Sequence, residues 1–205
     1  MRGLILNTVR VRDEDLIVKI ITNTEVLSLY RFYGARHSYI NSGFFIDFVV
    51  EENYKSTIKR LRNVAQIPFK FLFEREKLFY FKEYVRLLNI HFTDVSRVDN
   101  FYYDSLFRLA ESLHQRDAKR AIIEHYAGLL EKEGRLYKDK NCFLCEKKVD
   151  KKIALARSFL VAHEKCIMSD GFDAEKIDIL FNEKKTILFS DEEIEKLWKI
   201  LSLGI

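Results

Sequence analysis

Glycine and proline are scarce in this chain of 205 residues, which has seven glycines and one proline. Together they make up about 4% of the sequence, against roughly 12% in an average protein, so collagen-like, linker-rich and low-complexity proteins are excluded. No apolar run approaches the roughly 18 residues that cross a bilayer. The apolar start at residues 4–6 is interrupted by Asn7 and Arg10, so we expect no secretory signal. These absences predict a soluble, cytoplasmic protein without a membrane partner.

Long blocks of one charge are also missing, and the net charge is only +4. Residues 1–80 hold 13 Lys and Arg against 9 Asp and Glu, whereas residues 81–205 hold 22 of each sign. The whole basic excess therefore lies in the first part of the chain. A local basic surface favours a polyanionic partner, although basic side chains that are merely solvated would give the same count.

The first third of the chain has the pattern of short strands. β-Branched residues and alternating apolar residues predict five of them, at residues 3–12, 16–22, 26–33, 44–50 and 58–67. That number and spacing are typical of a small closed or partly closed barrel.

Pro68 marks a change to helical spacing, and we expect it at the first position of a helix that extends to about residue 92. Asn100 is the expected cap of a second helix, and a third is expected over residues 117–133, with Gly134 ending it. Ser190 and Glu193 form a predicted capping box before a last amphipathic helix. The pattern predicts an α+β protein.

Three cysteines lie within 25 residues and predict a metal site. Cys142 and Cys145 are separated by two residues, and His163 and Cys166 repeat that spacing further along the chain. Two such pairs match the tetrahedral demand of Zn²⁺, and four protein ligands leave no open position for water, so we expect a structural zinc. The alternative is that the cysteines are free thiols and His163 is a surface residue.

Basic and aromatic residues are interleaved along the predicted strands. A positive surface with stackable rings is a common way to hold single-stranded nucleic acid. We expect Phe32 and one of Tyr30 and Tyr33 to lie in the core, and the basic residues to form the binding surface. The candidate DNA-binding residues are Arg10, Arg12, Lys19, Arg31, Arg36, Lys59, Arg60 and Arg62.

Four short motifs resemble the RecO family of bacterial DNA repair proteins. They are MRGLIL at residues 1–6, RDEDLIV at 12–18, LS at 27–28 and GAR at 34–36. The resemblance implies an N-terminal OB-fold at residues 1–67 and a mostly helical domain at residues 68–205, with an inserted zinc knuckle at residues 140–170. The knuckle departs from the family pattern, because His163 stands where zinc-bearing relatives generally have Cys and the flanking glycines are missing.

The resemblance also implies a function. Members of the family bind single- and double-stranded DNA, anneal complementary strands and act with RecR and the single-strand binding protein to load the RecA recombinase. We therefore expect a non-enzymatic mediator of recombination that is associated with the nucleoid. Two alternatives from other classes stay open, an RNA-binding OB-fold and zinc protein and a nucleic-acid-processing enzyme such as a nuclease.

Overall fold

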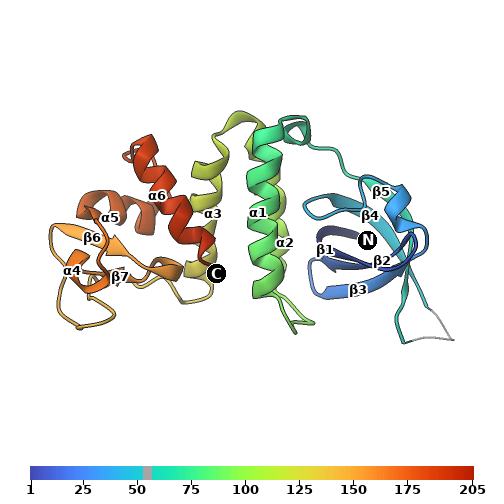
Figure 1. Ribbon diagram of the computed structural model, residues 1–205, viewed down its shortest axis with the longest axis horizontal. Coiled ribbons are helices and arrows are strands. Elements are labelled where there is room, and N and C mark those ends of the chain that lie inside the picture. Colours follow the sequence, from blue (N-terminus) through green and yellow to red (C-terminus); the bar gives the residue numbers. More distant parts are fainter. Residues whose placement is uncertain (53–56) are drawn as a thin grey trace. The chain divides into compact units, whose positions relative to one another are not determined.

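A computed structural model describes residues 1–52 and 57–205 of the chain, which form two compact units, Met1–Gln115 and Arg116–Ile205. The first unit contains a five-stranded barrel and two helices, and the second contains helices around a small sheet (Figure 1). The predicted α+β class, with an OB-like barrel followed by helices, is confirmed. The predicted domain boundary between residues 67 and 68 stays a prediction. In the described part of the chain, every helix is too short or too polar to span a bilayer.

All five predicted strands are present and close into a barrel. They are β1 (Arg2–Arg12), β2 (Asp15–Ile21), β3 (Val26–Arg31), β4 (Phe45–Glu51) and β5 (Arg60–Gln66). The hydrogen-bonded order is β1-β2-β3-β5-β4, and β4 pairs with β1 to close the ring. All neighbouring pairs are antiparallel except β3 and β5, which are parallel where Tyr30 lies opposite Arg60.

Apolar residues that alternate along these strands point inward and fill the inside of the barrel. The buried residues of this core are Ile5, Leu16, Val18, Ile20, Leu29, Ile40, Ile46, Phe48 and Leu61. Two glycines of the family motifs allow close packing there. A Cβ atom on Gly3 would lie 2.4 Å from Cγ2 of Ile20, and one on Gly34 would lie 2.9 Å from the side chain of Leu16.

The expected helix after Pro68 begins later than predicted. Helix α1 spans Arg75–His91, and a 3-10 turn, η2, occupies Lys70–Phe73. Phe69 and Phe71 are both buried, and each packs against aromatic rings, Phe69 with Phe45 at 5.1 Å and Phe71 with Phe81 at 5.1 Å between ring centroids. Two buried rings at positions i and i+2 do not share one face of an α-helix, so the helix starts only after them.

Helix α2 (Asn100–Ser112) and the turn η3 (Leu113–Gln115) complete the first unit. Asn100 is not the cap that we expected. Its neighbour Asp99 accepts a hydrogen bond from the N–H of Phe101 at 2.8 Å and makes Asn100 the first helical residue.

The second unit begins with α3 (Ala118–Lys132), and Gly134 follows it with φ of +68°, as its predicted role requires. Helix α6 (Asp191–Ser202) has the predicted capping box of Ser190 and Glu193. Between these helices lie elements that the sequence pattern did not predict. They are β6 (Lys152–Leu155), η4 (Arg157–Phe159), β7 (Val161–Ala162), α4 (Glu164–Ile167), β8 (Phe172–Asp173) and α5 (Ala174–Glu183). The three strands form one sheet in the order β7-β6-β8.

Candidate functional site

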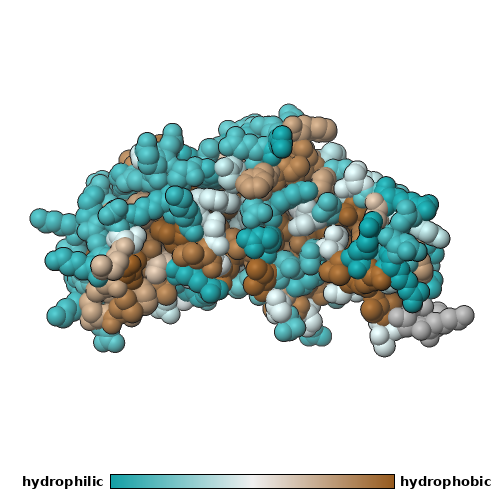
Figure 2. Space-filling view, in the orientation of Figure 1, coloured by the Kyte–Doolittle hydropathy of each residue, from teal (hydrophilic) through white to brown (hydrophobic). Residues whose placement is uncertain are grey.

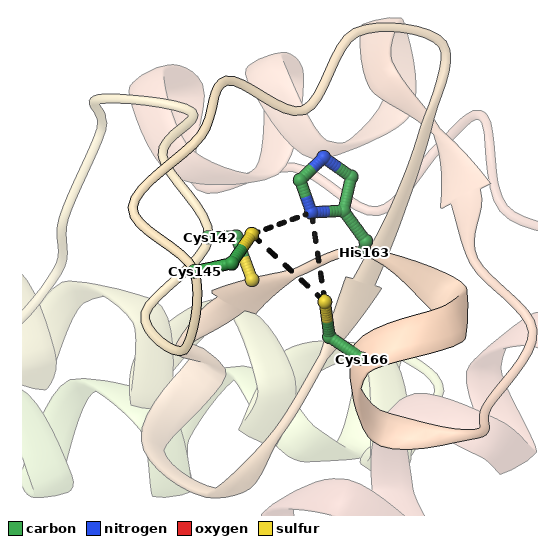
Figure 3. A group of neighbouring side chains, drawn as sticks. All are labelled: Cys142, Cys145, His163 and Cys166. Carbon is green, nitrogen blue, oxygen red and sulfur yellow. Dashed lines mark hydrogen bonds between the residues drawn. The ribbon is translucent and has the colours of Figure 1, made fainter.

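The four predicted metal ligands lie together in the second unit. The ligand atoms of Cys142, Cys145, His163 and Cys166 all lie within 4.8 Å of one another, and their side chains point toward a common centre (Figure 3). Cys142 and Cys145 come from a tight turn, His163 immediately precedes α4, and Cys166 lies within α4. Among the described residues, this is the one group of three or more Cys, His, Asp or Glu residues able to hold a metal ion.

Backbone hydrogen bonds hold the two halves of this cluster in place. The N–H of Cys142 donates to the carbonyl of Lys147 at 2.9 Å, and the N–H of Glu146 donates to the carbonyl of Cys142 at 2.8 Å, which closes the turn. Phe143 donates to the carbonyl of Val161 at 2.9 Å and so ties the turn to β7. Glu146 has φ of +60°, the left-handed conformation that glycine would adopt without strain.

The distances in the cluster suit a tetrahedral zinc site. Zinc bonds of about 2.3 Å to sulfur and 2.0–2.1 Å to nitrogen place two sulfurs about 3.8 Å apart, and sulfur about 3.6 Å from nitrogen. The sulfurs of Cys145 and Cys166 are 3.9 Å apart. Nδ1 of His163 lies 3.4 Å from the sulfur of Cys145 and 3.8 Å from that of Cys166. The residues present therefore match the needs of a zinc ion.

The ring nitrogen of His163 that faces away from the cluster, Nε2, has a hydrogen-bond partner that orients the ring. Nε2 lies 3.0 Å from the carbonyl oxygen of Lys148, to which it donates. That bond fixes the tautomer that leaves Nδ1 free to bind a metal. Although burial raises the pKa of the Cys142 thiol, hydrogen bonds from the backbone of Cys145 and His163 lower it to about 6. Thiolate is the form that binds metal.

A second candidate site lies on the barrel, where the basic and aromatic residues were predicted. A pocket of about 470 Å³ lies between β1, β2, β3 and the start of β5. Figure 2 shows hydrophobic side chains gathered over the β3 side of the barrel. The lining residues are Val11, Arg12, Ile17, Tyr30, Phe32, Ile58 and Arg60.

None of the three aromatic residues at positions 30, 32 and 33 is buried, so our expectation that Phe32 and one of Tyr30 and Tyr33 lie in the core is wrong. Phe32 is 40% exposed and Tyr33 is 57% exposed, while Tyr30 is half-buried. The buried residue of this strand is Leu29, and alternation puts Tyr30 on the opposite face. The hydroxyl of Tyr30 donates to Asp15, which lowers the pKa of Asp15 and raises that of Tyr30.

Two arginines stack on these exposed rings. The guanidinium of Arg60 lies 5.2 Å from the centre of the Phe32 ring, and that of Arg36 lies 4.6 Å from the centre of the Tyr33 ring. Both distances are within the range of cation–π attraction. The pocket therefore presents flat apolar surface beside positive charge.

The eight predicted DNA-binding residues differ in whether their side chains already pair with other groups of the protein. Arg10 and Arg12 are exposed and have no ion-pair partner among the described residues. Four others pair with glutamates: Arg36 with Glu14, Lys59 with Glu52, and Arg60 and Arg62 both with Glu51.

The side chains of Arg31 and Lys19 donate hydrogen bonds to backbone carbonyls of the protein. Arg31 donates to the carbonyl of Leu61 at 3.2 Å. Lys19 donates to the carbonyls of Asn89 and Phe92, at 3.2 and 2.9 Å, where α1 ends, and burial lowers its pKa. We did not predict Val11, Ile17 and Ile58 as lining residues, because apolar side chains are expected in the core.

The comparisons with known proteins agree with this geometry. The family described as RecO N terminal matches residues 1–72, a segment that contains all five strands of the barrel and ends within the turn η2. No curated protein matches the chain. Residues 1–72 of this chain are therefore a RecO N-terminal domain, which confirms the resemblance predicted from its sequence.

Proposed function

We propose that this chain is a RecO-type DNA repair protein that binds single- and double-stranded DNA, anneals complementary strands and helps to load the RecA recombinase with RecR. The observation that carries the proposal is the exposed basic and aromatic pocket on a barrel that belongs to the RecO family. We propose the single-strand binding protein as a further partner. The protein would act in the cytoplasm, in association with the nucleoid.

The barrel pocket supports a simple way to hold a DNA strand. Phe32 offers an exposed ring on which a base can stack, and Arg12 and Arg60 flank it with positive charge for the phosphates. Every base has a π-face and every nucleotide has a phosphate, so such binding is independent of sequence. We leave Lys19 out of this surface because its ammonium group is already bound to two carbonyl oxygens.

Annealing follows from charge neutralisation without covalent chemistry. Two complementary strands repel one another through their phosphates, and bound arginines and lysines replace the counterions that would otherwise screen that repulsion. The proposed protein is therefore not an enzyme. It brings strands together and lets base pairing supply the specificity.

Zinc completes the proposal as a structural ion held by Cys142, Cys145, His163 and Cys166. Four protein ligands close the coordination shell, so no position is left for an activated water. The ion would join the turn at residues 142–145 to α4, whereas the backbone hydrogen bond of Phe143 joins that turn to β7.

Competition experiments separate this function from the two alternatives. A labelled single-stranded DNA should be displaced by unlabelled DNA at lower concentration than by RNA of the same sequence, and it should stay intact during incubation with Mg²⁺. Preferential displacement by RNA would instead favour an RNA-binding protein. Cleavage of the labelled strand would favour a nuclease.

Replacing Phe32 by Ala should weaken binding to single-stranded DNA. Loss of one base stack costs about 1–3 kcal/mol of binding free energy, roughly 5- to 150-fold in Kd. Fluorescence anisotropy with a labelled oligonucleotide measures the change. The matched control is Phe73→Ala, which removes a ring that is 90% exposed in the same unit but outside the pocket. Equal affinities for the two variants would contradict the assignment of the pocket.

A further inference from the structure

A second pocket in the first unit is separate from the pocket on the barrel face. It has a volume of about 350 Å³ and lies between the start of β1, the turn from β2 to β3, and α2. Arg2 lines it, whereas Arg12, ten residues further along β1, lines the first pocket. The two pockets have no lining residue in common, so they are separate sites.

Positive charge exceeds negative charge in this second pocket. Arg2 and Arg108 both line it, and in residues 1–52 and 57–205 neither side chain has an ion-pair or hydrogen-bond partner. Asp104 supplies the one carboxylate of the lining, and nearby Asp47 is paired with the N-terminal amino group at 3.4 Å. The lining therefore carries two guanidinium groups against one carboxylate, which favours an anionic ligand.

Tyr103 provides a buried hydrogen-bond donor in the same pocket. The residue is only 5% exposed, and its hydroxyl has no hydrogen-bond partner among the described residues. Its ring is fixed by edge-on contact with Phe45 and by packing against Phe107, at 6.0 and 5.9 Å between centroids. A buried polar atom without a partner is rare in native proteins and calls for an explanation, such as a bound group that completes it.

The charged groups that act on Tyr103 include two residues that line the same pocket. Burial is the main reason that the pKa of the Tyr103 hydroxyl is raised to about 12. The charges of Arg2, Asp104 and Asp47 also act on this hydroxyl. Arg2 and Asp104 line the pocket together with Tyr103. At neutral pH the hydroxyl keeps its proton and is able to donate a hydrogen bond.

We propose that this pocket binds a phosphate group, with Arg2 and Arg108 pairing with its charge and Tyr103 donating a hydrogen bond to one of its oxygens. The three donors come from two separate elements, β1 and α2. A tetrahedral oxyanion offers oxygens in several directions to donors arranged in this way, while a carboxylate offers only two in one plane. The phosphate is either a free or mononucleotide phosphate or one in a nucleic-acid backbone.

Calorimetric titration with inorganic phosphate at low ionic strength tests the proposal. Tyr103→Phe keeps the ring and removes only the donor, so phosphate should bind about tenfold more weakly or worse. Arg108→Gln should weaken phosphate binding at least as much, and Asp104→Asn should strengthen it because a repelling charge is removed. The control is Arg86→Gln, an exposed arginine on α1 outside the pocket, which should bind phosphate like the unchanged protein.

Thermal unfolding distinguishes binding from folding. Without phosphate, Tyr103→Phe should melt at the same or a higher temperature, because it removes an unpaired buried hydroxyl. With phosphate, the unchanged protein should gain stability and Tyr103→Phe should gain much less. Phosphate that binds all four variants equally, or does not bind the unchanged protein at millimolar concentration, would overturn the proposal.

Competition identifies the source of the phosphate. A single-stranded oligonucleotide without terminal phosphates that displaces inorganic phosphate from Phe32→Ala protein assigns the site to a nucleic-acid backbone. Failure to displace it assigns the site to a free or mononucleotide phosphate. Both results report on the phosphate pocket itself, and Phe32→Ala weakens the competing binding of DNA at the barrel face.

Discussion

Replacing Cys142 by Ser should abolish metal binding and unfold the cluster while the barrel stays folded. Cys142 is the most buried of the four ligands, with 1% of its surface exposed, and a hydroxyl is a poor substitute for a thiolate toward zinc. Because the binding free energy of a structural zinc is also folding free energy, the second unit should lose about 4 kcal/mol or more of stability. Metal analysis should find about one zinc per unchanged chain and almost none per variant chain.

The matched control for this change is His163→Cys, which supplies a fourth thiolate at the same position and should keep the metal. Hydrogen exchange should show loss of protection in residues 140–170 of Cys142→Ser and little change in β1 to β5. The same variant should keep most of its affinity for DNA, because the proposed binding face is on the barrel. Metal-free protein with an unchanged melting temperature would show that these cysteines are ordinary thiols.

Reversing two charges on β5 should produce the largest loss of DNA affinity. Arg60→Glu together with Arg62→Glu turns two cations into anions beside Glu51, which already lies 3.6 and 3.1 Å from them. If the unchanged protein neutralises about four phosphates, log Kobs should fall with log salt at a slope near −3 on single strands. The variant should show a slope about half as steep, and every DNA sequence should be weakened alike.

An equal change of charge elsewhere in the first unit serves as the control. Arg75→Glu with Arg86→Glu alters two exposed arginines of α1 outside the pocket and should leave most of the affinity in place. Binding that does not respond to salt, or that prefers one sequence strongly, would contradict a surface made of phosphate contacts.

The strands and most helices could be predicted because their signals are local. Alternation such as that around Leu29 and the capping box of Ser190 depend only on neighbours in the chain. The same alternation places Tyr30 on the outer face. Our prediction of a core position for these aromatic residues was therefore wrong although the pattern indicated the outer face. The start of α1 was predicted too early because the burial of Phe69 and Phe71 against distant rings outweighed helical spacing.

The two candidate sites differ in how far the sequence predicts them. The spacing of the cysteines and His163 predicts the cluster, since paired ligands two residues apart belong to one turn. The phosphate pocket could not be predicted, because Arg2 and Tyr103 are 101 positions apart and meet only through the packing of α2 near the start of β1. For the same reason, the hydrogen bonds from Lys19 to carbonyls at the end of α1 could not be predicted from the sequence.

Strand annealing is the most direct test of the central claim, our proposal that the face of this RecO N-terminal barrel joins complementary DNA strands. Two complementary oligonucleotides, one labelled, are mixed with and without the protein, both bare and coated with the single-strand binding protein. We predict that the unchanged protein accelerates annealing of both forms without any nucleotide cofactor, and that Arg60→Glu with Arg62→Glu removes most of the acceleration. An unchanged annealing rate in the presence of the protein, or full acceleration by the charge-reversed variant, would contradict the account.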